Sequence, residues 1–149
     1  MENLFDKSTN EELLRRINSL KETSQPLWGK MNAAQMLAHC QKPLEVAIGR
    51  LPVKRGLIGL LFGKMFKNSF LKNREMKKNL PTLPSFKMDM PRNFENEKLM
   101  LLGLVKQFGD QGPSIIANKK HPIFGPMTDE EWGILGYRHL DHHLRQFGV

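Results

Sequence analysis

The sequence predicts an all-α protein that folds as an up-down-down-up four-helix bundle. Helical patterns with clear start signals recur along the chain, and no segment shows the sustained alternation of a β-strand. The chain has 149 residues, of which 40% are hydrophobic, and this is enough for one core. We therefore expect residues 1–149 to form a single helical domain.

The second predicted helix has a well-marked start. Asn32 is an N-cap residue, and Gln35 follows three positions later, where its side chain can reach back to the cap. The apolar pattern continues to about Ile48 and meets Gly49. We expect a helix over residues 33–48.

The last helix starts in the same way. Thr128 supplies the cap and Glu131 its partner, so a helix is expected over residues 129–146.

Two more helices complete the predicted bundle. One starts after Ser8 or Thr9 and ends near Glu22, and the other follows Asn93 and ends near Gly109. The short link after the first helix predicts that it and the second helix are antiparallel neighbours.

About 40 residues separate the second helix from the third, which is long enough for a crossover that leaves these helices parallel. Within the crossover, residues 57–71 combine leucines and phenylalanines with lysines and glycines. This pattern favours a short amphipathic helix over the bundle.

The net charge of +8 comes from one segment. Residues 50–80 contain nine Lys or Arg and one acid, while acids and bases balance elsewhere. Such a segment can attract an anionic membrane, nucleic acid or an anionic substrate, or can be a solvated loop. Nucleic-acid binding is disfavoured because we find no pattern of interleaved aromatic residues or recognition helix.

The sequence predicts a cytoplasmic location. Cys40 is the sole cysteine, so no intrachain disulfide can form. The first residues lack the basic and apolar regions of a secretory signal, and no stretch approaches the length of a membrane span.

The histidines are the main candidates for a functional site. His139 and His143 lie one turn apart on one helical face, which also carries Trp132, and they can grip one metal ion together. His39 reaches the same level if the second and last helices are antiparallel. Alternatively, the pair is only part of an amphipathic face, as such short patterns often are.

The remaining candidates have other roles. We expect His142 to serve in proton transfer beside the site, or simply to be exposed. Cys40 is predicted to be a small buried residue and His121 a turn residue.

Several segments together carry a family likeness: Trp28-Gly29-Lys30-Met31, Met36-Leu37-Ala38-His39-Cys40, Pro81-Thr82-Leu83-Pro84, His121-Pro122-Ile123-Phe124-Gly125 and His139-Leu140-Asp141-His142-His143-Leu144-Arg145-Gln146. On these residues the chain resembles the DinB/YfiT-like superfamily. The resemblance implies an up-down-down-up bundle with a three-histidine metal site that matches His39, His139 and His143. It also implies a metal-dependent hydrolase or thiol-dependent S-transferase, and an association as homodimers.

Three neutral imidazoles suit divalent zinc, nickel or iron, or copper, and leave an open position for water or a thiol. Neither histidine face carries an Asp or Glu that could act as general base, which slightly favours thiol transfer or an unassigned reaction on a small-molecule substrate. The alternative is a non-enzymatic binding protein that uses segment 50–80 on an anionic membrane or partner. A helical domain whose histidines only fill space is a third interpretation.

Overall fold

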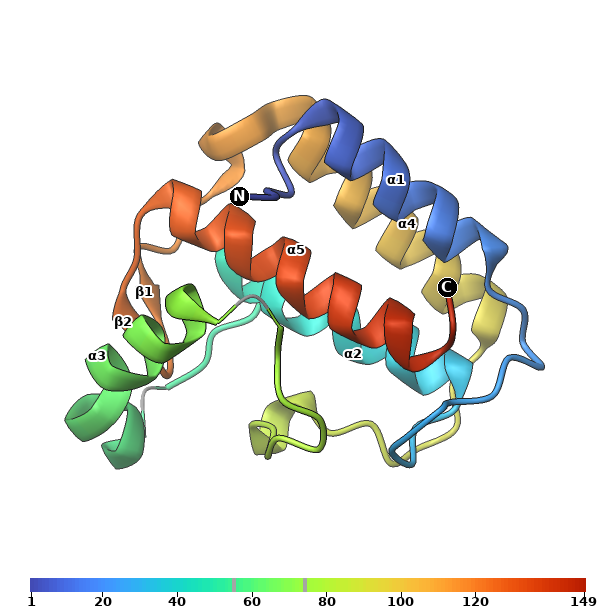
Figure 1. Ribbon diagram of the computed structural model, residues 1–149, viewed down its shortest axis with the longest axis horizontal. Coiled ribbons are helices and arrows are strands. Elements are labelled where there is room, and N and C mark those ends of the chain that lie inside the picture. Colours follow the sequence, from blue (N-terminus) through green and yellow to red (C-terminus); the bar gives the residue numbers. More distant parts are fainter. Residues whose placement is uncertain (55, 74) are drawn as a thin grey trace.

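The computed structural model describes residues 1–54, 56–73 and 75–149, and the chain is mostly helical over these ranges (Figure 1). Arg55 and Arg74, two residues of the basic segment, and the side chain of Ile58 lie outside the described part. In chain order the described elements are α1 (Lys7–Ser19), α2 (Ala33–Ala47), α3 (Leu57–Lys72), the 3₁₀ turn η1 (Pro84–Phe86), α4 (Phe94–Gln111), the 3₁₀ turn η2 (Gly112–Ile115), β1 (Lys120–His121), β2 (Gly125–Pro126) and α5 (Asp129–Gln146).

The capping signals place α2 and α5 correctly. The Asn32 side chain accepts a hydrogen bond from the Gln35 backbone N–H, and the Gln35 side chain accepts one from the Asn32 backbone. Thr128 and Glu131 form the same reciprocal pair at the start of α5. These pairs satisfy backbone N–H groups that the first turn of a helix leaves free.

The predicted bounds of α1 are wrong at both ends. The helix begins at Lys7, ahead of Ser8 and Thr9, and it ends at Ser19. Asp6 occupies the N-cap position without a side-chain hydrogen bond. Tertiary contacts fix the start instead, because the buried Leu4 donates its N–H to the backbone of α5 and accepts from the Asn10 side chain.

Among the described residues, α1 packs mainly on α4 and α5, and α2 also packs on α4 and α5. The expectation that α1 and α2 are neighbours is therefore wrong. α1 and α4 run antiparallel, since the Asn10 side chain donates to the Val105 carbonyl and Lys98 donates to the carbonyl of Leu20. Figure 1 shows this pair on one side of the molecule.

α2 and α4 run parallel, as the crossover predicts. Gln41 in α2 donates to the carboxylate of Glu97 in the first turns of α4, at 2.7 Å. At the other end, the Ala47 carbonyl accepts from the backbone N–H of Ala117, which follows α4. α5 lies against α2 in the opposite direction, with Gly136 near Leu44.

The crossover carries α3, as predicted, but this helix does not cover the body with its apolar residues. It packs against the β1–β2 hairpin, whose residues Lys120 and His121 pair with Pro126 and Gly125. The sequence pattern missed the hairpin because each strand has only two residues. Figure 1 shows α3 standing off beside the hairpin.

The core lies between α1, α2, α4 and α5. Its largest fully buried side chains include Trp132, Phe108 and Met36. None of the helices in the described ranges combines the length and the apolar character needed to cross a membrane.

Candidate metal centre

Three histidines meet between α2 and α5. His39 comes from α2, and His139 and His143 come from successive turns of α5. One ring nitrogen from each lies within 4.8 Å of the other two. The cluster is buried. His139 is partly exposed when its whole residue is considered, whereas His39 and His143 are buried throughout. The predicted set of three thus comes together.

The opposed directions of α2 and α5 produce this meeting. Gly136, one turn before His139, lets α5 approach its neighbours closely. A Cβ atom there would lie 2.8 Å from a methyl carbon of Leu4 and 3.4 Å from one of Leu44. Because a glycine brings the backbones together at this level, the imidazoles of the next turns can reach across to His39.

A backbone carbonyl holds the His39 ring. Its Nδ1 lies 2.9 Å from the carbonyl oxygen of Phe86, in the η1 turn. A carbonyl only accepts, so Nδ1 carries the proton and Nε2 presents a lone pair to the cluster. The Phe86 side chain is buried against the same ring, with centroids 6.5 Å apart. The return of the crossover therefore orients a candidate ligand.

The His143 ring is held by an amide side chain. Its Nδ1 lies 2.8 Å from Oε1 of the buried Gln146, which accepts a hydrogen bond from the ring N–H. Gln146 in turn donates its amide to the carbonyl of Trp28 at 2.6 Å. Gly29 makes room, because a Cβ atom there would lie 2.5 Å from the Gln146 amide nitrogen. Such hydrogen bonds behind a metal-binding histidine fix its tautomer and its direction.

The three imidazoles are neutral at ordinary pH. Burial lowers the pKa of His39, although the hydrogen bond to Phe86 partly opposes this. Burial also lowers the pKa of His143 to about 3. For His139 the pKa falls well below its usual value, because of burial first and then the neighbouring imidazoles. Neutral rings have the lone pairs that a metal ion requires.

The spacing of the nitrogens suits a shared ion. Nε2 of His39 and Nε2 of His139 lie 3.1 Å apart. Two nitrogens bound to one zinc ion at about 2.0–2.1 Å lie roughly 3.3 Å apart in a tetrahedral site. The cluster therefore has the donor type of a three-histidine metal site, with one pair of nitrogens near the expected spacing and all three within 4.8 Å.

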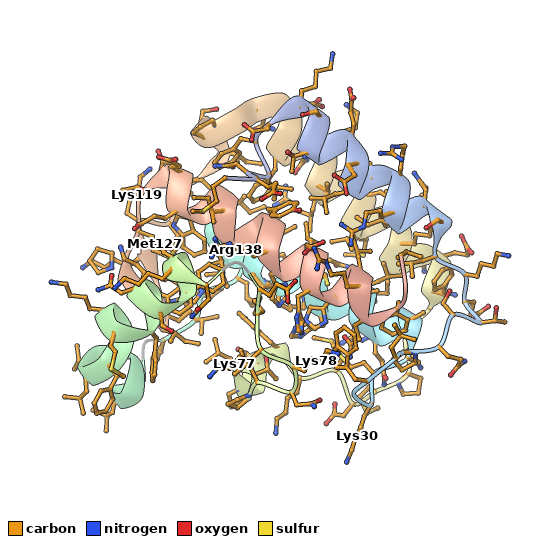
Figure 2. All side chains as sticks on the ribbon, viewed as in Figure 1. Lys30, Lys77, Lys78, Lys119, Met127 and Arg138 are labelled. Atoms are coloured by element: carbon orange, nitrogen blue, oxygen red, sulfur yellow. The ribbon has the colours of Figure 1, made fainter. Side chains whose placement is uncertain are left out.

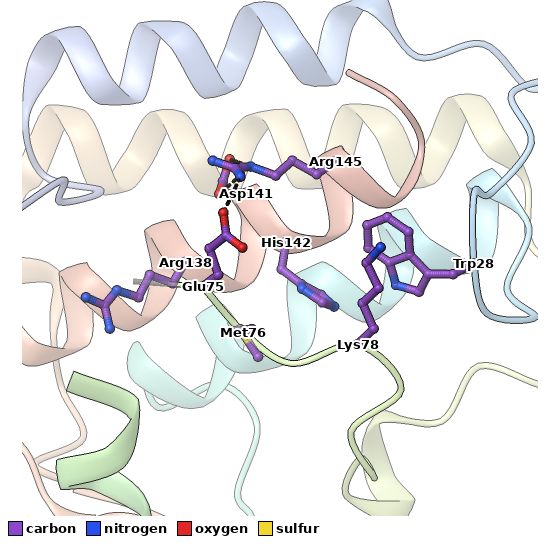
Figure 3. Close-up of a pocket in the computed structure, with 8 residues that line it drawn as sticks. All are labelled: Trp28, Glu75, Met76, Lys78, Arg138, Asp141, His142 and Arg145. Carbon is purple, nitrogen blue, oxygen red and sulfur yellow. Dashed lines mark hydrogen bonds and ion pairs between the residues drawn. The ribbon is translucent and has the colours of Figure 1, made fainter. Parts of the chain in front are cut away.

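A cavity of about 260 Å³ opens next to the cluster (Figure 3). His142, which is half-buried, lies between the two, with its ring centroid 5.0 Å from that of His143 and 5.7 Å from that of Trp28. Figure 3 shows this ring pointing from α5 toward Lys78 and Trp28. The cavity is also lined by Glu75, Met76, Arg138, Asp141 and Arg145.

The charges around the cavity are unevenly paired. Arg145 forms ion pairs with Glu75 at 3.1 Å and with Asp141 at 3.0 Å. Lys78 instead lies over the Trp28 ring, 4.2 Å from its centroid, and forms no ion pair within the described part of the chain. An ammonium group and a neutral imidazole thus face the same space, where burial lowers the pKa of His142.

The other two candidates stay outside the cluster. Cys40 is buried, its thiol donates to the sulfur of Met36, and burial raises its pKa. It is the small buried residue that the sequence predicts. His121 lies in the β1–β2 hairpin, where its Nδ1 accepts from the backbone N–H groups of Ile123 and Phe124. His121 is thus the last residue of β1, next to the turn rather than in it as the sequence predicts.

Sequence reasoning missed the residues behind the ligands. Gln146 lies three residues after His143, a spacing that puts both on one helical face, so this role had a local signal. Phe86 and Trp28 had no sequence signal. They accept these hydrogen bonds with their backbone carbonyls, which every residue type has.

Comparison with known proteins identifies the family of this chain. The model of the family described as "Protein of unknown function (DUF1569)" matches residues 3–148, so the chain belongs to that family. No curated protein and no solved structure matches the chain.

Proposed function

We propose that this member of the DUF1569 family is a metal-dependent enzyme that holds one divalent ion with His39, His139 and His143. The observation that supports this most directly is the convergence of three neutral imidazole nitrogens within 4.8 Å. Two of the rings are also oriented from behind, by Phe86 and Gln146. Metal-binding histidines in proteins are usually oriented by hydrogen bonds of this kind. Zinc, nickel and iron all suit such a donor set.

The cavity beside His142 supports a catalytic over a structural role. An ion with three protein ligands keeps a position for a small ligand and lowers the pKa of a water or thiol held there. His142 borders both the cluster and the cavity, so we assign it proton transfer to or from the substrate. Lys78 has no ion-pair partner among the described residues and lines the same cavity, which favours a small anionic substrate.

The reaction class is either hydrolysis or thiol-dependent S-transfer, and we favour the second. The described residues place no carboxylate in the three-histidine cluster. Asp141, the acid nearest along α5, is engaged by Arg16 at 2.8 Å and by Arg145. A hydrolase would therefore depend on His142 as its base, whereas a thiol needs only to lose its proton on binding.

The fold proposed with this function is the up-down-down-up four-helix bundle of the DinB/YfiT-like superfamily, made of α1, α2, α4 and α5. The pairwise directions of these helices support it, with α1 antiparallel to α4 and α2 parallel to α4. The homodimer and the cytoplasmic location stay predictions.

The proposal can be tested with cobalt(II), which replaces zinc and absorbs visible light. We expect cobalt loading to give a spectrum of nitrogen coordination in the natural chain and in His142→Ala, but none in His139→Ala. Adding 2-mercaptoethanol should then produce a sulfur-to-cobalt charge-transfer band if thiol chemistry applies. Turnover of p-nitrophenyl acetate without such a band would favour hydrolysis. A chain that takes up no cobalt would contradict the proposal.

A further inference from the structure

Helix α3 presents a stripe of large apolar side chains to solvent. Leu57, Leu61 and Met65 follow one another at every fourth position and so form one stripe along the helix. Their exposed fractions are 77%, 72% and 58%. Leu60 and Phe62 flank the stripe and are exposed as well. We call Leu57, Leu60, Leu61, Phe62 and Met65 the outer face of α3.

The opposite side of α3 packs on the protein with two glycines, a lysine and a phenylalanine. Gly59 and Gly63 are buried there, and a Cβ atom at Gly59 would lie 2.7 Å from the carbonyl oxygen of Pro122. Lys67 extends the same side and donates to Glu131 at 2.9 Å. Phe70 then stacks on Phe124, with centroids 5.5 Å apart.

This arrangement reverses the usual amphipathic helix. A helix that covers a protein core turns its leucines and phenylalanines inward. Here glycines, a paired lysine and Phe70 face inward, while Leu57, Leu60 and Leu61 point away from the body. Figure 2 shows the side chains of α3 extending into the space beyond the rest of the molecule. Burial of the outer face would therefore need an apolar partner outside the chain, and exposed apolar patches often mark such interaction sites.

The charges around the outer face are all positive. Lys64 and Lys72 stand beside the apolar stripe and are exposed. The sequence has no Asp or Glu from Val46 to residue 74, a stretch that includes the whole of α3. The exposed apolar side chains of the outer face thus lie next to cationic side chains, and the helix has no acidic residue.

We propose that the outer face of α3 docks on the surface of an anionic lipid bilayer. The helix would lie in the plane of the interface, with Leu57, Leu61 and Met65 among the acyl chains. Lys64 and Lys72 would extend to the lipid phosphates, as long cationic side chains do. With 16 residues, α3 is shorter than the ~20 that a helix needs to cross a bilayer.

Charge complementarity favours a bilayer over a second copy of the chain. Two copies joined through this face would bring Lys64 and Lys72 of each close to those of the other, without acids to offset them. An anionic surface instead attracts Lys64 and Lys72 at once. The proposal does not depend on the metal site, because no candidate ligand belongs to α3.

The test is co-sedimentation of the full chain with lipid vesicles. We expect binding to vesicles of phosphatidylcholine mixed with phosphatidylserine. Binding to phosphatidylcholine alone should be weaker by roughly tenfold or more. The double variant Leu61→Glu/Met65→Glu should lose binding by roughly tenfold or more. The matched control is Leu99→Glu/Met100→Glu, which changes two exposed apolar residues of α4 and should bind like the natural chain.

Added salt and Lys64→Glu/Lys72→Glu should each weaken binding to the anionic vesicles. Thermal unfolding of every variant shows whether the fold is kept, and binding is compared only among folded chains. Equal binding to both kinds of vesicle, or none, would overturn the proposal. A dimer in sedimentation velocity that Leu61→Glu/Met65→Glu dissociates would also overturn it, since the face would then join two copies.

Discussion

Nε2 of His39 and Nε2 of His139 lie 3.1 Å apart across the contact between α2 and α5. Since the Phe86 carbonyl holds the proton of His39 on Nδ1, the Nε2 atom of His39 can only accept. Without an ion, the proton between the rings therefore belongs to His139. A metal ion at this point takes the place of that proton and needs only a change of tautomer at His139.

We expect Gln146→Ala to weaken metal binding by roughly ten- to a hundredfold while leaving the fold intact. The variant removes the acceptor that holds the proton of His143 on Nδ1, and it also frees the Trp28 loop. Competition with a chromophoric chelator measures the affinity. Gln107→Ala, a half-buried glutamine of α4, is the control and should bind like the natural chain. Equal affinities of all three chains would contradict the assigned role.

His142→Ala should separate metal binding from catalysis. It keeps all three ligands, so the metal content should stay that of the natural chain, while turnover falls by roughly a hundred- to ten-thousandfold. His143→Ala should instead lose both. Elemental analysis measures the metal content. Turnover is measured with the substrate class, thiol or ester, that the cobalt experiment supports. Loss of metal from His142→Ala would show that this ring is a ligand.

The free energy of unfolding of the metal-free chain should fall as the pH drops below about 6.5, the usual pKa of histidine. Burial lowers the pKa of His121 to about 3, so the unfolded chain takes up a proton that the folded chain refuses. The stability from His121 is complete above pH 6.5 and is lost as the pH falls toward 3. Its contribution to the slope is about 1.4 kcal/mol per pH unit.

The variant His121→Asn isolates this contribution. It keeps an acceptor for the N–H groups of Ile123 and Phe124 but does not titrate. Urea unfolding between pH 7 and pH 4 should give a shallower slope for the variant by about 1.4 kcal/mol per unit. Identical slopes would mean that His121 does not stay neutral in the folded chain.

Gly59→Ala should destabilise the docking of α3 on the hairpin by about 1–3 kcal/mol. The added methyl group would press on the Pro122 carbonyl, and this outweighs the better helix propensity of alanine. Gly56→Ala is the matched control, since a Cβ atom there meets nothing within 4 Å. Thermal unfolding compares the two. If Gly59→Ala were as stable as Gly56→Ala, α3 would not pack on the hairpin as described.

The sequence predicts most of the helices and the ligand set for local reasons. Capping pairs such as Asn32 with Gln35 act within one turn, so they mark the start of α2 without knowledge of the fold. The spacing of His139 and His143 likewise fixes a shared face of α5. His39 joins them because the long crossover permits α2 to run parallel to α4, and α5 then lies antiparallel to α2.

Other features depend on contacts that no local pattern records. The start of α1 is set by Leu4 and Asn10, which bond to other elements. The outward leucines of α3 follow from the close approach of Gly59 to the hairpin, so the helical pattern alone predicted the wrong orientation. The carbonyls of Phe86 and Trp28 act through their backbones and leave no trace in residue type.

The central claim is that one divalent ion binds where the three histidines meet, and its most direct test is metal stoichiometry. Purified natural chain, His139→Ala and His121→Asn are each incubated with zinc, desalted and measured by elemental analysis. The account predicts one zinc per chain in the natural protein and in His121→Asn, which alters a buried histidine outside the cluster, and only traces in His139→Ala. Equal zinc in all three chains, or only traces in the natural protein, would contradict it.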